Sequence, residues 1–267
     1  MTRNNAPARF IPAFTLTLAL TQALTQALAG AGPALAATLV RDPETCQRLA
    51  ESAPAEALTA AREWAGHGGG DQAQLCRAAA LFQTGDFTAA GRIYETQATG
   101  ASRNDRQIAG LYDRAAWAFL RAGDAGRADY LYSRALEKLP DDAELRIDRG
   151  IARAESRKYR DAVVDFTVAL KHQPQRADAY YYRAAAYREL MDLKSARDDV
   201  ELSLRLRPGD AEALVLRGTI RAATGDAAGA RLDWREVVRR DPESPPGKAA
   251  AASLRRLDEA GPAPAKP

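Results

Sequence analysis

The sequence predicts an all-α protein, a right-handed α-solenoid of short helical hairpins, because three features recur with a period of 34 residues. Prolines fall at this spacing, and a small residue is followed four positions later by a large one in phase with them. The prolines are Pro140, Pro174, Pro208 and Pro242, and the small and large pairs are Ala128 and Tyr132, Ala162 and Phe166, Ala196 and Val200, and Ala230 and Trp234. Aromatic residues make up only 7% of the chain. Alanine supplies much of the 46% hydrophobic content instead. Small side chains of this kind suit close helix contacts better than a β-rich core.

The first 36 residues have the three parts of a secretory signal peptide. Residues 1–41 contain no Asp or Glu, and Arg3 and Arg9 form a basic start. An apolar middle follows, ending at Ala34-Leu35-Ala36. We therefore expect cleavage near Ala36, a secreted or periplasmic location, and no stable membrane insertion of the remainder. An uncleaved amphipathic helix or an anchor is the alternative.

The chain contains only two cysteines, Cys46 and Cys76. An even cysteine count in an exported chain favours a disulfide. The two residues fall on the first and third predicted helices, which are neighbours in a solenoid. The alternative is a pair of buried free thiols, which behave as small apolar groups. We expect no metal site, since the two cysteines lack nearby ligands and His67 and His172 are the only histidines.

The rest of the sequence divides into segments according to how well each one follows the 34-residue period. Residues 37–70 predict a degenerate helical hairpin, and residues 71–108 a divergent unit with a connection that holds about four extra residues. Residues 109–242 predict four regular units, each closed by a proline that cannot continue the helix. Residues 243–267 predict a capping helix, with Ala251, Leu254 and Leu257 on one side, and a disordered tail.

In each regular unit a small residue stands at the eighth position of the first helix, where a larger one would force the two helices apart. These residues are Ala116, Gly150, Ala184 and Gly218. A two-residue turn then leads to the second helix. The turns are Gly123-Asp124, Arg157-Lys158, Met191-Asp192 and Gly225-Asp226. We expect the large residue of the second helix to fill the gap to the next unit.

A charge pattern also repeats. Arginine at the seventh position is accompanied by aspartate sixteen residues later in three units, and both are missing from the first unit, which has Ala115 and Leu131. We interpret these residues as ion pairs within hairpins. The pairs are Arg149 and Asp165, Arg183 and Asp199, and Arg217 and Asp233. The alternative is an arginine ladder for an anionic ligand.

These positions resemble the tetratricopeptide repeat (TPR) family over about residues 71–242. The usual tryptophan at the fourth position is replaced in every regular unit, and Arg157 and Met191 replace the turn glycine. The resemblance implies a non-catalytic scaffold that holds a protein or peptide on its concave face. Mapped onto this chain, the partner-binding residues it implies are Arg114, Trp117, Arg121, Ile147, Ile151, Tyr181, Tyr182 and Arg188. The alternative is that Trp117 and Tyr181 pack on neighbouring units.

The sequence shows no nucleophile elbow, phosphate loop or zinc-protease motif. We expect no enzyme activity and no cofactor. With 38 basic and 35 acidic residues, the near-balanced charge also argues against a nucleic-acid partner. The expected function is a scaffold or adaptor for a protein or peptide in the periplasm or cell envelope. The alternatives are a self-associating assembly element, which would form homo-oligomers, and an accessory subunit of a polysaccharide-handling or secretion complex.

Overall fold

The computed structural model describes residues 40–100 and 103–259. The chain divides into Met1–Ala36 and Ala37–Pro267, and every described residue belongs to the second part. The predicted signal peptide with its cut near Ala36, and the predicted disordered tail, lie outside the described residues. None of the helices in the described ranges is long and apolar enough to cross a membrane.

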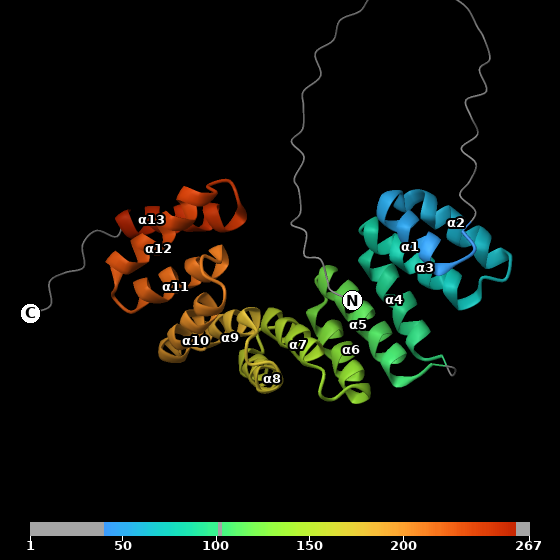
Figure 1. Ribbon diagram of the computed structural model, residues 1–267, viewed down its shortest axis with the longest axis horizontal. Coiled ribbons are helices and arrows are strands. Elements are labelled where there is room, and N and C mark those ends of the chain that lie inside the picture. Colours follow the sequence, from blue (N-terminus) through green and yellow to red (C-terminus); the bar gives the residue numbers. More distant parts are fainter. Residues whose placement is uncertain (1–39, 101–102, 260–267) are drawn as a thin grey trace, which may run out of the picture. The chain divides into compact units, whose positions relative to one another are not determined.

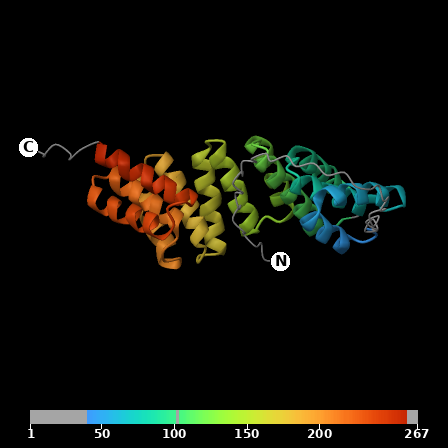
Figure 2. The same cartoon turned by 90° about the horizontal axis from the view of Figure 1, so that it is seen from above.

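The described residues form thirteen α-helices and no strand, so the predicted all-α repeat fold is confirmed. The helices are α1 Pro43–Ser52, α2 Pro54–Gly66, α3 Gly70–Gln83, α4 Phe87–Ala98, α5 Asp105–Arg121, α6 Ala125–Lys138, α7 Ala143–Glu155, α8 Tyr159–His172, α9 Ala177–Glu189, α10 Leu193–Leu206, α11 Ala211–Ala223, α12 Ala227–Arg240 and α13 Pro245–Glu259. Each packs mainly against its neighbours in the chain, as Figures 1 and 2 show, and α1 also packs against α3. Odd-numbered helices also touch one another, as α7 does α5 and α9, so they share one face.

The extra residues before the regular units lie in a helix and not in a loop, contrary to expectation. Helix α5 begins at Asp105, four residues before Ala109, and has 17 residues where α7 has 13. Asn104 and Gln107 form a reciprocal capping box at its start. This arrangement satisfies two backbone N–H groups and stabilises one additional helical turn.

Side chains cap most of the second helices. Asp124, Asp192 and Asp226 each accept a hydrogen bond from the backbone N–H three residues later, at 2.9, 3.1 and 2.8 Å. The second unit lacks this cap because Lys158 stands at the equivalent position. Its ammonium group instead binds Asp129 of the preceding unit at 2.8 Å.

The large residue of the second helix is seated on the small residue of the first helix in its own hairpin. Phe166 is fully buried, and a Cβ added to Gly150 would lie 2.6 Å from its ring. Trp234 covers Gly218 in the same way and donates from Nε1 to the carbonyl of Val215 at 3.2 Å. We expected the large residue to fill the gap to the next unit. The Phe166 ring does contact the next unit, because it stacks on Tyr182 of α9 at a centroid distance of 6.0 Å, but it also fills the space inside its own hairpin.

Replacing Gly150 with alanine should lower the free energy of unfolding by about 1–3 kcal/mol, because the new methyl overlaps a ring that cannot move away. Gly110→Ala is the matched control. Gly110 is an exposed helical glycine with no atom within 4 Å of an added Cβ, so that variant should gain up to about 1 kcal/mol. Urea unfolding followed by circular dichroism measures both. Equal effects of the two substitutions would contradict the packing described above.

The two turns without glycine adopt the conformation that glycine favours. Arg157 and Met191 have φ of 59° and 61°, at the positions where Gly123 and Gly225 have 82° and 88°. A side chain in this left-handed region costs about 1–2 kcal/mol. Met191 is 74% exposed, so little packing offsets that cost.

Met191→Gly should therefore stabilise the protein by about 0.5–1 kcal/mol, since glycine removes the steric cost and adds only its backbone entropy. The control is Leu190→Gly, one residue earlier, where φ is −80°. That substitution should destabilise, because nothing there requires glycine. Thermal unfolding of the two variants tests this, and a lower melting temperature for Met191→Gly would contradict it.

The last helix packs through two of the three residues that the sequence placed on its inner side, and the third is replaced by its neighbour. Helix α13 begins at Pro245, and its buried residues are Gly247, Ala250 and Ser253. Leu254 and Leu257 pack against the core of the last regular unit as expected. Ala251 is only half-buried, and Ala250 takes its place in the contact.

Candidate functional site: a pocket on the odd-numbered helices

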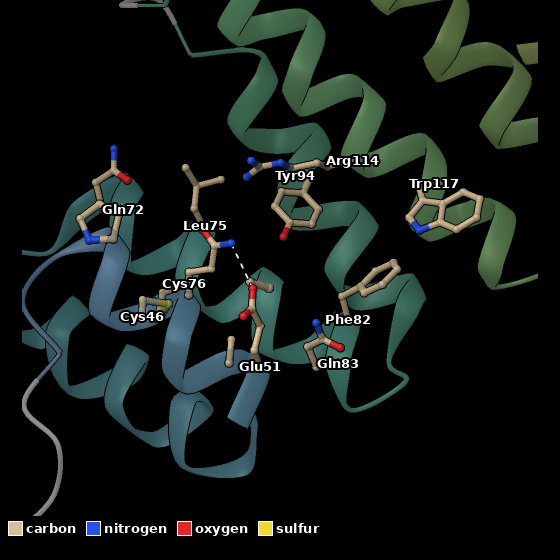
Figure 3. A pocket seen from close by; sticks show the side chains of 14 residues that line it. Cys46, Glu51, Gln72, Leu75, Cys76, Phe82, Gln83, Tyr94, Arg114 and Trp117 are labelled. Atoms are coloured by element: carbon tan, nitrogen blue, oxygen red, sulfur yellow. Dashed lines mark hydrogen bonds between the residues drawn. A yellow bond between two sulfur atoms is a disulfide. The ribbon is translucent and has the colours of Figure 1, made fainter. Parts of the chain in front are cut away.

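A pocket of about 420 Å³ opens on the face of the odd-numbered helices near the N-terminal end of the described chain. Helices α1, α3 and α5 supply most of its walls, and Tyr94 reaches it from α4. The lining residues are Pro43, Cys46, Gln47, Ala50, Glu51, Gln72, Leu75, Cys76, Ala79, Phe82, Gln83, Tyr94, Arg114 and Trp117. Figure 3 shows the cysteine pair toward one end of the pocket and Trp117 at the other.

A disulfide between Cys46 and Cys76 ties two walls of this pocket together. The two Cα atoms lie 5.6 Å apart, and both residues are almost fully buried. The bond joins α1 to α3, the first and third helices, across 30 residues of sequence. It holds α1 in place where the repeat signature is absent.

The pocket combines an apolar lining with polar side chains at its edges. Leu75, Ala79 and Phe82 project from α3, and Trp117 projects from α5. Amide side chains come from α1 and α3, where Gln47 donates to Glu51 at 3.1 Å. Pockets that bind ligands characteristically pair an apolar lining with a few polar groups that set orientation.

Of the residues that the TPR resemblance implied for partner binding, the pocket contains Arg114 and Trp117. Arg121 lies one turn after Trp117, with its guanidinium 5.9 Å from the indole ring and 4.8 Å from the Phe87 ring. Sequence reasoning missed the walls from α1 and α3. The glutamines there belong to no repeated position, so periodicity gave no signal for them.

Other implied residues lie farther along the array. Tyr181 and Tyr182 meet edge to face at 5.2 Å, and burial raises the pKa of the Tyr181 hydroxyl to about 12. This hydroxyl therefore stays protonated at neutral pH. Ile151 is half-buried, and Arg188 pairs with the neighbouring Glu189.

The assignment of Ile147 to a partner-binding surface is wrong. Its side chain is 3% exposed and belongs to the core cluster that contains Phe166 and Ala179. An apolar residue on α7 is covered there by α8 and α9. It contributes to packing and does not present a contact surface.

The six charged residues expected to pair lie in contact. Arg149 donates to both oxygens of Asp165, at 2.9 and 2.6 Å. Arg183 holds Asp199 at 2.7 and 2.8 Å, and Arg217 holds Asp233 at 3.0 and 2.6 Å. Each aspartate is buried, and each bidentate pair joins the two helices of one hairpin.

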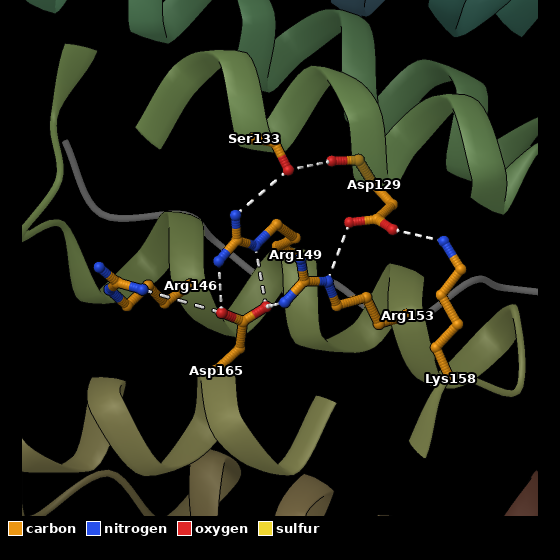
Figure 4. A network of polar contacts seen from close by, with 7 residues as sticks. All are labelled: Asp129, Ser133, Arg146, Arg149, Arg153, Lys158 and Asp165. Atoms are coloured by element: carbon orange, nitrogen blue, oxygen red, sulfur yellow. Dashed lines mark hydrogen bonds and ion pairs between the residues drawn. The ribbon is translucent and has the colours of Figure 1, made fainter. Parts of the chain in front are cut away.

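Around Asp165 the ion pair extends into a network that periodicity did not predict (Figure 4). Arg153 donates to Asp165 at 2.8 Å and to Asp129 at 2.9 Å, which links the first two regular units. Burial raises the pKa of Asp129, but hydrogen bonds from Lys158 and Arg153 outweigh burial and hold it below the ordinary value. Because the pKa of Asp129 is lower in the folded state than in the unfolded state, its ion pairs stabilise the fold at neutral pH. That stabilisation is lost as pH falls below about 4 and Asp129 becomes protonated.

The array of repeated helical hairpins defines the class as a helical repeat protein. Two curated relatives agree with this class: tetratricopeptide repeat protein 36 of Danio rerio and tetratricopeptide repeat protein 16 of Macaca fascicularis. The first is 36% identical over 41% of this chain and 59% of its own length, and the second 31% identical over 40% of this chain and 13% of its own length. This chain thus spans less than two thirds of either relative. No protein-family model matches the chain.

Solved structures share the fold. A MamA fragment from Desulfovibrio magneticus RS-1 superimposes with a TM-score of 0.56 at 18% identity, over 62% of this chain and 93% of that one. A structure of IFIT1 with Gppp-AAAA gives a TM-score of 0.62 at 17% identity, over 81% of this chain and 55% of that one. The predicted resemblance to tetratricopeptide repeat proteins is confirmed by the curated relatives and this fold.

Proposed function

We propose that this chain is a non-catalytic scaffold that binds a segment of a partner polypeptide in the pocket between α1, α3 and α5. The open pocket with an apolar lining is the observation that carries the proposal. Its lining side chains project from packed helices, so the protein loses little conformational entropy when a ligand binds. Glutamine side chains both donate and accept hydrogen bonds, which suits the alternating groups of a peptide backbone.

The proposal includes export to the periplasm or another oxidising compartment. It draws on the signal-peptide pattern of the first 36 residues and on the Cys46–Cys76 disulfide. Disulfides persist in such compartments and are rare where thiols are kept reduced.

The test is affinity capture from the cell envelope with the wild-type chain and Trp117→Ala, because Trp117 lines the pocket. Tyr130→Ala is the control, an aromatic residue that is 51% exposed on α6, away from the pocket. We expect a partner that is retained by wild type and the control and lost with Trp117→Ala, at unchanged helicity. Identical capture by all three would refute the pocket as the binding site.

A further inference from the structure

Two arginines of α5 at the pocket differ from the arginines of α7, α9 and α11, which all pair with carboxylates. Arg149, Arg183 and Arg217 are each held by a buried aspartate. Arg114 and Arg121 are exposed, and neither forms an ion pair with a carboxylate in the described part of the chain. Their positive charges are therefore available to a ligand.

These two arginines and Trp117 occupy one side of α5. The three residues are spaced by three and four positions, which places them in a row along the helix. The guanidinium of Arg114 lies 6.0 Å from the Tyr94 ring, and that of Arg121 lies 4.8 Å from the Phe87 ring. Contact with an aromatic face orients a guanidinium without using its N–H donors.

The opposite wall is uncharged apart from one carboxylate. Gln47, Gln72 and Gln83 contribute amides from α1 and α3. Glu51 lies on α1 and is held by Gln47. A second carboxylate is unfavourable near Glu51 and favourable near α5, so the pocket has a defined electrostatic polarity.

We propose that the pocket selects an internal acidic segment of the partner. An apolar side chain of that segment lies between Leu75, Phe82 and Trp117. Carboxylates on either side of it in the segment bind Arg114 and Arg121. This inference rests on the proposed function and adds the chemical class of the ligand. Guanidinium groups bind carboxylates through paired N–H donors, which gives orientation as well as affinity. Side-chain carboxylates are the proposed source, and a free peptide C-terminus would offer the same chemistry.

The experiment selects ligands from a library of short random peptides displayed between constant flanking residues, with the whole oxidised chain as the target. Enriched peptides are then synthesised with amidated C-termini, so that only side-chain carboxylates remain. Fluorescence anisotropy compares wild type, the double variant Arg114→Gln and Arg121→Gln, Trp117→Ala, and the control Arg160→Gln. Arg160 is exposed on α8, away from the pocket.

We expect acidic peptides whose Kd rises about tenfold in the double variant and is unchanged in the control, since two partly exposed charge-assisted contacts are lost. Their affinity should also fall with added salt. Neutral or basic peptides that need Trp117 but neither arginine would overturn this inference and leave the proposed function standing. Binding that appears only with a free C-terminus would likewise overturn the side-chain assignment. If no enriched peptide depends on Trp117, both proposals fail.

Discussion

Replacing Asp165 with alanine is expected to lower the free energy of unfolding by about 3–5 kcal/mol. The carboxylate is fully buried and accepts hydrogen bonds from Arg149 and Arg153, and Arg146 approaches it at 3.8 Å. Their guanidinium groups are largely buried, so removing the aspartate leaves positive charges that water reaches poorly. Urea unfolding of the variant measures the loss.

Asp198→Ala is the matched control, because this aspartate belongs to the next hairpin and its side chain is 53% exposed. It should change stability by no more than about 0.5 kcal/mol. A loss below about 1 kcal/mol for Asp165→Ala would show that water or a rearranged partner replaces the carboxylate. The network would then contribute little to stability.

Loss of the disulfide is expected to destabilise the N-terminal helices by about 3–4 kcal/mol on the chain-entropy model, for a loop of 30 residues. In the double variant Cys46→Ser and Cys76→Ser, amide hydrogen exchange in α1 and α3 should accelerate by at least about 100-fold. Exchange in α9–α12 should stay unchanged, because each hairpin of a repeat array contacts only its neighbours. Uniform acceleration along the chain would instead indicate one cooperative unit.

The regular part of the fold was predictable because its packing repeats. The small and large residues and the prolines recur every 34 residues, as does the Arg–Asp spacing in three units. Helices α7, α9 and α11 begin with the same period, at Ala143, Ala177 and Ala211. Interactions that occur once were not predictable in this way. Asp129 has no equivalent in the other units, so its contacts with Arg153 and Lys158 gave no periodic signal.

The candidate site was predictable only on its α5 side. Arg114 and Trp117 stand at repeat positions, whereas Gln47 and Gln72 belong to helices without a clear register. The error at Ile147 has a related cause. Position within a repeat indicates which way a side chain points, but the packing of the following unit decides whether that side chain is covered.

The seating of a large ring on a glycine within one hairpin limits how this array can recombine. Phe166 with Gly150 and Trp234 with Gly218 are matched pairs, whereas the third unit combines Val200 with Ala184. A gene fusion that joined α9 to α12 would set the Ala184 methyl against the Trp234 indole, where an added Cβ comes within 2.5 Å in the native pair. Whole hairpins are therefore the units that duplication or protein engineering can exchange, with crossover points between hairpins and not inside them.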